Sequence, residues 1–350
     1  MPAEREDRLI ETLFARHSAD GDNVLIGPGD DAALLRCPPE EQLLITTDTL
    51  NEGVHFPAGT PAHSVGHRAL AVSLSDLAAM AARPLWAVVT LSVPVADEDW
   101  LGGFAEGLYA LADVHGVRVV GGDFVRGPLS ITVTAHGSAR EEAVLRRDGA
   151  GAGDGIWVSG FLGDAAAGLE VLKQRLEVNS LPLGVGALLP RPSSPFRRAG
   201  TPSDPEGHPE SSEEALVHRF CYPQPRIELG RRLSGIATAC MDLSDGLLTD
   251  LPRLMRKSGL QGRVEAENLP ISRALRDFAG LDDSRRLALA GGDDYELCFA
   301  VPEGNEDRLK TLPDELQLTR IGDVYVGEGL VLTRGGQPWE PPDSGFRHFS

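Results

Sequence analysis

The chain has 350 residues, more than a single hydrophobic core usually organises, so we expect two domains. The formal net charge of -19 argues against nucleic acid as a partner, because polyanions are bound by clustered Lys and Arg. Hydrophobic residues at 41% and charged residues at 24% are typical of a folded globular protein and exclude a largely disordered chain.

Cysteine spacing and hydropathy predict the compartment. The four cysteines show no C-x-x-C pattern, and the chain opens without a basic-then-apolar leader. No apolar run approaches the roughly 20 residues that a membrane helix needs. We therefore expect a protein of the reducing cytoplasm that makes no membrane contact.

The first 150 residues alternate between helical and strand patterns, and we interpret 1–150 as an N-terminal α/β domain. Helices are predicted over 4–17, 64–82 and 98–115, and strands over 42–48, 85–93, 117–120 and 130–136.

A Gly-rich turn over 149–155 marks the expected boundary, and residues 151–350 are interpreted as a second α/β domain. Residues 187–214 hold six prolines and five serines, a composition that cannot build a packed core, so we expect a disordered insertion there. The other elements predicted in this domain are strands over 156–160, 237–243, 295–301 and 319–326, and helices from about 164 and over 225–233 and 246–257.

Aspartates near the ends of predicted elements carry the main chemical signal. Each one alone is more often structural, because Asp in a Gly-rich loop usually caps a helix or makes a turn. Asp76 is harder to explain in this way, since it is expected to be buried on one face of an otherwise apolar helix, where a carboxylate needs a cation or donors. The full set is Asp30, Asp31, Asp48, Asp76, Asp123, Asp242 and Asp245.

Two of these aspartates are predicted to stand at strand ends. Asp48 follows Thr46 and Thr47, whose oxygens are ligands of the kind that Mg²⁺ prefers. Asp123 follows two glycines, the second of them Gly122, which leave room for a phosphate to approach the backbone. Bound divalent cations would explain how so acidic a chain accepts an anionic substrate.

Phosphates must be held without a P-loop, because none of the three lysines follows a G-x-x-x-x-G pattern. Carboxylate-bound Mg²⁺ and an arginine are the alternative, and Arg147 is a candidate, although a lone Arg is more often a surface residue. Asp242, Ser244 and Asp245 stand where a strand passes into a helix, and a helix cap explains Asp245 equally well.

In their order along the chain these motifs resemble the thiamine-monophosphate kinase family, which belongs to an ATP-binding superfamily with aminoimidazole ribonucleotide synthetase and selenophosphate synthetase. The resemblance covers nearly the whole chain. It implies two α/β domains with mixed sheets in an aminoimidazole ribonucleotide synthetase-like fold, the N-terminal one pairing with its twin in a homodimer. The segments that carry it are GPGDDAALL, TTDTLNEGVHF, ALAVSLSDLAAMAARP, VVGGD, SGFLGDAAAGL, MDLSDGLLTDL, GGDDYELCF and the terminal GFRHF.

The resemblance implies direct in-line transfer of the γ-phosphoryl group of ATP, as co-substrate, onto thiamine monophosphate, giving thiamine diphosphate without a phosphoenzyme. ATP contacts are expected from Tyr109, Gly122, Asp123, Arg147 and Ser244, with a core position as the alternative for Tyr109. Contacts to thiamine phosphate are expected from His55, Asp293 and Phe346. Several Mg²⁺ ions would be held by Asp31, Thr46, Thr47, Asp48, Asp76, Asp123, Asp242 and Asp245, with Asp48, Asp76 and Asp123 as the catalytic carboxylates.

Three alternatives remain open beside the kinase. The first is another ATP-dependent synthetase of the same superfamily, although selenophosphate synthetase would want a reactive Cys or selenocysteine near the N-terminus and no cysteine precedes Cys37. The second is a non-catalytic nucleotide-binding regulator, which the presence of all the metal-type carboxylates disfavours. The third is a metal-dependent phosphohydrolase, which would use the same aspartates and is separable by its products. The sequence departs from the family at Asp293, where Glu is common, so that contact is expected to be weaker or water-mediated.

Overall fold

A computed structural model describes residues 23–179 and 211–340, and the helix expected over 4–17 lies outside them. The described residues form two compact units. Those of the first fall within Met1–Leu145 and Gln224–Gly235, and those of the second within Arg146–Pro223 and Ile236–Ser350. The expected α/β class with mixed sheets is confirmed. In the described part of the chain no helix is long and apolar enough to cross a membrane.

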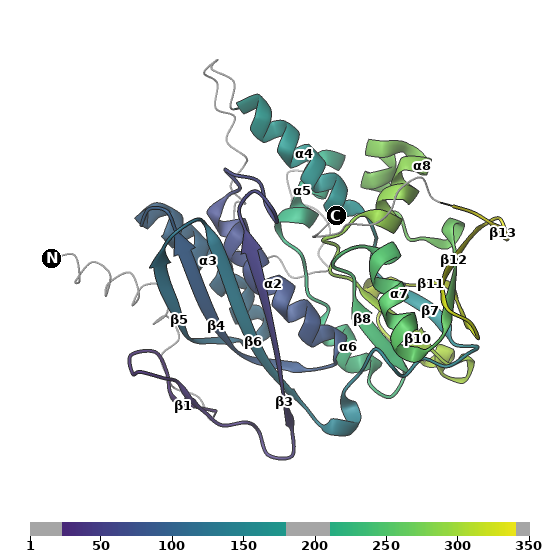
Figure 1. Ribbon diagram of the computed structural model, residues 1–350, viewed down its shortest axis with the longest axis horizontal. Coiled ribbons are helices and arrows are strands. Elements are labelled where there is room, and N and C mark those ends of the chain that lie inside the picture. Colours follow the sequence, from purple (N-terminus) through teal and green to yellow (C-terminus); the bar gives the residue numbers. More distant parts are fainter. Residues whose placement is uncertain (1–22, 180–210, 341–350) are drawn as a thin grey trace. The chain divides into compact units, whose positions relative to one another are not determined.

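The first unit is built on a four-stranded sheet in the order β3-β6-β4-β5 (Figure 1). Its strands are β3 (Gln42–Asn51), β6 (Ser130–Ala139), β4 (Arg83–Val93) and β5 (Arg118–Arg126). β6 runs antiparallel to both of its neighbours, whereas β5 runs parallel to β4. Because side chains alternate along each strand, this register decides which residues share a face of the sheet.

Two helices, α2 (Ala62–Ala79) and α3 (Glu98–His115), pack against one face of this sheet (Figure 1). They approach each other closely through glycines. A Cβ atom added at Gly107 would lie 1.8 Å from the backbone oxygen of His63, and Gly66 makes the reciprocal close approach from α2. No larger residue fits at either position without moving a helix.

Local signals explain the ends of α3, which match the predicted range 98–115. The Asp97 side chain accepts hydrogen bonds from the backbone N–H groups of Asp99 and Trp100, which satisfies donors that the first helical turn leaves unpaired. Gly116 ends the helix in the left-handed conformation at φ 66°, which glycine adopts without strain.

Two further pieces belong to the described part of the first unit. The short antiparallel pair β1 (Val24–Ile26) and β2 (Leu34–Leu35) packs against a small cluster that includes Trp86 on the sheet. The helix α6 (Ile227–Leu233) returns from later in the chain, and Gly230 lets it contact the end of α2, where an added Cβ would lie 1.9 Å from a backbone oxygen.

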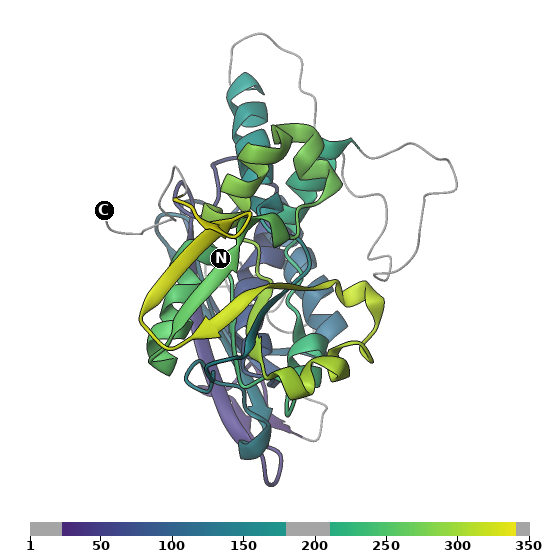
Figure 2. The same cartoon turned by 90° about the vertical axis from the view of Figure 1, so that its right-hand side faces the viewer.

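The second unit is built on a seven-stranded sheet in the order β13-β12-β9-β11-β7-β10-β8. Strands of this unit, drawn in green and yellow, are seen in Figure 2. All neighbouring strands are antiparallel except β12 and β9. The strands are β7 (Gly155–Ser159), β8 (Ala239–Asp242), β9 (Gln261–Glu265), β10 (Leu297–Val301), β11 (Leu318–Tyr325), β12 (Gly329–Arg334) and β13 (Gln337–Pro338).

Helices of the second unit fall into two groups. α4, α5 and α8 pack on one another around a cluster that contains Leu216, Leu275 and Leu287. α7 instead buries Leu251 and Leu254 against the strands, in the main core of the unit. The helices are α4 (Asp164–Asn179), α5 (Ser212–Cys221), α7 (Leu247–Ser258), α8 (Arg273–Ala290) and the short α9 (Glu306–Leu309).

Most predicted elements are confirmed, but β5 is longer than expected. It continues through Gly121 and Gly122 to Arg126, because β4 supplies backbone partners along its whole length. Asp123 therefore lies inside an edge strand, and the prediction that it follows a strand end is wrong. β3 likewise continues to Asn51, so Asp48 lies inside a strand as well.

The expected disordered interval 187–214 needs a correction at its end. Ser211 and Glu214 form a reciprocal capping box, with Ser211 Oγ accepting from the Glu214 N–H at 3.2 Å and the Glu214 carboxylate accepting from the Ser211 N–H at 3.1 Å. Residues 212–214 thus belong to the first turn of α5. The serines that were counted as a sign of disorder include the residue that caps this helix. Residues 187–210 lie outside the described residues.

Candidate functional site

Two of the predicted carboxylates meet between β3 and α2 in the first unit. The Thr46 hydroxyl donates to Asp76 Oδ2 at 2.5 Å, and the Ser73 hydroxyl donates to Asp48 Oδ2 at 3.0 Å. Both aspartates are half-buried, so Asp76 is less buried than expected. Hydroxyl donors partly satisfy each carboxylate and leave both within reach of solvent.

The electrostatics of this pair favour a cation. Burial and the negative charge of Asp76 together raise the pKa of Asp48 to about 6, even though the hydrogen bond from Ser73 acts in the opposite direction. A raised carboxylate pKa means that the negative charge is poorly compensated by the protein itself. A bound divalent cation would supply the missing compensation, and the oxygens present are of the hard type that Mg²⁺ takes.

The threonine next to this pair faces the other way. Alternation along β3 directs Thr46 and Asp48 toward α2 and Thr47 to the opposite face, where its hydroxyl lies 3.1 Å from that of Thr134. Thr47 can therefore offer only its backbone carbonyl to a ligand held by Asp48. The sequence pattern alone placed both threonines beside the carboxylate.

Register also separates Asp123 from Asp48. Asp123 pairs with Thr90, Thr90 with Thr132, and Thr132 with Thr49, so all four side chains lie on the face opposite to α2. β3 and β5 are the two edges of the sheet, roughly 14 Å apart at about 4.8 Å per strand. Within the first unit the catalytic trio expected from the sequence is thus not brought together.

Three other predicted residues of the first unit lie apart from the carboxylate pair. Asp31 is exposed in the connection between β1 and β2, where its N–H donates to Asp30 Oδ1 at 2.8 Å. His55 lies in the turn after β3, with Nδ1 accepting from the Asn51 N–H at 2.9 Å. Tyr109 is 0% exposed in the core, which contradicts the expected side-chain contact with nucleotide.

In the second unit, predicted residues gather where β8 passes into α7. Asp242 is buried at the end of β8, and Ser244 and Asp245 form the turn that follows. Arg147 is exposed on the segment that leads into this unit, and its backbone oxygen accepts from Ser258 Oγ at 3.0 Å. Asp245 does not cap α7 with its side chain, so the capping alternative is wrong.

An aspartate that the sequence reasoning missed holds this turn. Asp250, 1% exposed, accepts through Oδ2 from the N–H groups of Ser244 at 3.0 Å and Asp245 at 2.8 Å. Arg253 bridges Asp245 and Asp250, with 2.7 Å contacts to each carboxylate. Burial raises the pKa of Asp250 to about 6. Its spacing of three from Arg253 on a helix is the sequence signal that predicts this pair.

The loop between α8 and β10 runs beside the same turn and carries Asp293. The Asp293 N–H donates to the backbone oxygen of Ser244 at 2.8 Å, and the Tyr295 hydroxyl donates to Asp293 Oδ1 at 3.2 Å. Asp293 and Tyr295 have left-handed backbones, at φ 69° and 50°, which cost roughly 1–3 kcal/mol each in a non-glycine residue. Phe346, predicted to act with Asp293, lies outside the described residues.

No single cluster within a unit resembles a complete metal site. Across residues 23–179 and 211–340, no three side chains among His, Cys, Asp and Glu stand together in a way that holds a metal ion. Pairs of carboxylates with hydroxyls are nevertheless what Mg²⁺ commonly uses, because it keeps several waters and takes phosphate oxygens as further ligands.

Comparisons with known proteins find two domains in order along the chain, and they differ from the two units at Gln224–Gly235. Residues 29–139 match the N-terminal domain of AIR synthase related protein, and residues 151–335 match the C-terminal domain. Thiamine-monophosphate kinase of Salmonella typhimurium is 39% identical over 348 residues, covering 99% of this chain and 98% of that protein.

Solved structures of thiamine-monophosphate kinases are similar to this chain in fold and sequence. The crystal structure of thiamine-monophosphate kinase from Stenotrophomonas maltophilia has a TM-score of 0.78 and 43% identity, covering 95% of this chain and 96% of that one. The structure of AaThiL complexed with AMPPCP and TMP has a TM-score of 0.71 and 31% identity, covering 90% of this chain and 89% of that one. With both domains matched in order and the sequence similar from end to end, the chain belongs to the thiamine-monophosphate kinase family of AIR synthase related proteins.

Proposed function

We propose that this protein transfers the γ-phosphoryl group of ATP to thiamine monophosphate, giving ADP and thiamine diphosphate. The observation that carries the proposal is the similarity over 99% of the chain to a thiamine-monophosphate kinase. The related AaThiL, 31% identical, was solved with AMPPCP and TMP, an ATP analogue and a ligand that we interpret as thiamine monophosphate. Transfer is proposed to be direct and in line, with a phosphate oxygen of the acceptor displacing ADP.

Magnesium is part of the proposal, held by oxygen ligands of the chain. Bound there, Mg²⁺ would neutralise negative charge on the phosphates of the substrates. The Asp48 and Asp76 pair supports this assignment, because its charge is incompletely balanced by hydroxyl donors. The proposed ligands are Asp31, Thr46, Thr47 through its carbonyl, Asp48, Asp76, Asp123, Asp242 and Asp245.

The chain's own groups are proposed to bind and orient the two substrates. Gly122, Arg147 and Ser244 are assigned to ATP, and Asp250 keeps the Ser244 turn in place through its two backbone contacts. His55, Asp293 and Phe346 are assigned to thiamine phosphate, with the Asp293 carboxylate facing the positive charge of the ring. Holding the acceptor phosphate near ATP supplies most of the catalysis expected in such transfers.

We also propose that the protein forms a homodimer and is located in the cytoplasm. The sheet face opposite to α2 supports the dimer, because Leu43 and Ile45 are 46% and 60% exposed there beside the threonine pairs. Light scattering of the purified chain tests the dimer. Substituting Ile45→Lys on this face should yield monomers, and an unchanged mass would contradict this use of the face.

One assay tests the function. The purified protein is incubated with ATP, Mg²⁺ and thiamine monophosphate, and the products are separated by chromatography. Equal amounts of ADP and thiamine diphosphate are expected, and Asp48→Asn should remove both. Exposed Asp307, which pairs with Lys310 at 2.6 Å, provides the matched control Asp307→Asn, which should keep full activity. Inorganic phosphate without thiamine diphosphate would indicate a hydrolase, and ATP binding without turnover a regulator.

A further inference from the structure

The loop that carries Asp293 alternates between two environments. Asp293 itself is half-buried, whereas the next residue, Asp294, is 3% exposed and Glu296 is 0% exposed. The residue between these two, Tyr295, directs its hydroxyl back to Asp293. One side of the loop therefore presents the proposed substrate carboxylate, and the other directs two carboxylates into the protein.

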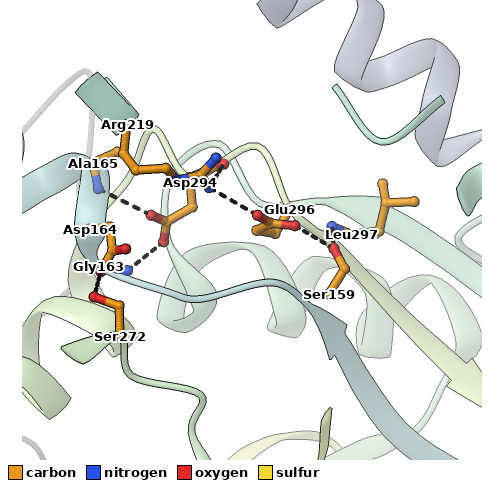
Figure 3. A network of polar contacts seen from close by, with 9 residues as sticks. All are labelled: Ser159, Gly163, Asp164, Ala165, Arg219, Ser272, Asp294, Glu296 and Leu297. Atoms are coloured by element: carbon orange, nitrogen blue, oxygen red, sulfur yellow. Dashed lines mark hydrogen bonds and ion pairs between the residues drawn. The ribbon is translucent and has the colours of Figure 1, made fainter. Parts of the chain in front are cut away.

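The two buried carboxylates are held by contacts that do not involve Asp293 (Figure 3). Asp294 Oδ2 accepts from the Gly163 N–H at 2.8 Å, at the start of α4, where the helix dipole favours a negative charge. Glu296 Oε2 accepts from the Ser159 hydroxyl at 2.5 Å, and Ser159 Oγ in turn accepts from the Leu297 N–H at 2.9 Å. The loop is thus attached to both α4 and β7.

Arg219 of α5 supplies the cation of this network. Its Nη2 donates to Glu296 Oε1 at 2.9 Å and to the backbone oxygen of Asp294 at 3.4 Å. Asp164 lies close by and accepts from the Ser272 hydroxyl at 2.7 Å (Figure 3). Burial raises the pKa of Asp294 well above its usual range, while the Gly163 N–H and the charge of Arg219 act in the opposite direction. Such a network keeps its geometry only while every member has its partner.

This arrangement explains how a left-handed backbone persists at Asp293. A non-glycine residue stays in that conformation only where its surroundings over-determine it. The loop is fixed on its buried side by Asp294 and Glu296, and on its other side by the bonds from the Asp293 and Tyr295 N–H groups to the β8–α7 turn, at 2.8 and 2.9 Å. Loss of the buried contacts would free the Asp293 carboxylate to leave the position in which it faces the substrate.

We propose that Asp294 and Glu296 are positioning residues, which set the affinity for thiamine monophosphate by holding Asp293 in place. The proposal rests on the role of Asp293 in the proposed function. ATP affinity should change little, because Asp250 also holds the Ser244 turn, through two backbone contacts that do not involve the loop. Recognition of thiamine monophosphate would then depend on Arg219 of α5, which is distant in sequence from the GGDDYEL motif.

Steady-state kinetics of the full-length Asp294→Asn enzyme test the proposal. The substitution keeps the side-chain size but replaces one acceptor oxygen by a donor. The Michaelis constant for thiamine monophosphate should rise about tenfold, equivalent to about 1.4 kcal/mol, with kcat and the constant for ATP within about twofold. Arg175→Met is the matched control, because it breaks the exposed Arg175–Glu213 pair between α4 and α5 at 3.0 Å without touching the loop. It should leave all three parameters unchanged.

A double-mutant cycle separates positioning from general destabilisation. If Asp294 acts through Asp293, then adding Asp294→Asn to an Asp293→Ala enzyme should not raise the Michaelis constant for thiamine monophosphate further. Ser159→Ala, which keeps every charged group, should show the same behaviour and serves if Asp294→Asn fails to fold. Two results would overturn the inference. One is a Michaelis constant for thiamine monophosphate that rises in the double variant by the full sum of the two single effects. The other is an unchanged constant in both Asp294→Asn and Ser159→Ala. An unchanged constant in Asp293→Ala alone would instead overturn the proposed role of Asp293 and the inference with it.

Discussion

Substituting Asp48→Asn should make the metal-free protein more stable while removing its activity. Asp48 has a folded-state pKa of about 6 against an ordinary value of 3.8, because it is partly buried and close to Asp76. The folded state therefore binds the proton more tightly than the unfolded chain. The charged form costs stability progressively as the pH rises from about 4 to about 6, and in full above that. Asparagine avoids this cost and still offers an oxygen to Ser73.

The magnitude follows from the size of the shift. A rise from 3.8 to about 6 corresponds to an upper limit of about 3 kcal/mol at pH 8, at about 1.4 kcal/mol per pKa unit. Solvent screening at a half-buried group reduces this, so we expect the variant to gain about 1–2 kcal/mol at pH 8. Well below pH 4 Asp48 is protonated in both the folded and the unfolded protein, so wild type and variant should approach equal stability.

Urea unfolding in EDTA between pH 4.5 and 8 measures the effect. Asp123→Asn is the control, because it removes an exposed carboxylate of the same sheet and should not give the stabilisation expected of Asp48→Asn. Added Mg²⁺ should stabilise the wild type more than Asp48→Asn, and only the wild type should turn over. A variant that is less stable at pH 8, or more stable by the same amount at every pH, would refute the electrostatic reasoning.

Three further predictions test packing, substrate recognition and metal dependence. Gly107→Ala should destabilise the protein by about 3 kcal/mol through its clash with α2, whereas Gly102→Ala on the same helix meets nothing within 4 Å and should not; thermal unfolding compares them. Phe346→Ala should raise the Michaelis constant for thiamine monophosphate and leave that for ATP unchanged in steady-state kinetics. An unaltered constant for thiamine monophosphate would instead assign Phe346 to packing. ATP binding should disappear in EDTA, because a site rich in carboxylates repels a bare triphosphate; calorimetric titrations of equal affinity would contradict this.

Much of the fold follows from local sequence signals. The range 98–115 was predictable to the residue because Asp97 and Gly116 are strong start and stop signals. Other elements were missed, among them β9, β12 and α8, which begins at the capping residue Ser272 but is broken at Gly280. The pair of glycines at 121–122 suggested a strand end, whereas tertiary pairing with β4 continues the strand through them.

The sequence by itself determined the family and the inventory of chemical groups, because motifs such as MDLSDG and GGDDYEL keep their order along the whole chain. Only the tertiary structure decided which of these groups meet. The pairing register puts Asp48 beside Asp76 and turns Thr47 and Asp123 to the other face, since a side chain's face depends on the strand's partners. Burial likewise separates Asp293 from its neighbour Asp294, a difference that two identical letters in a motif cannot express.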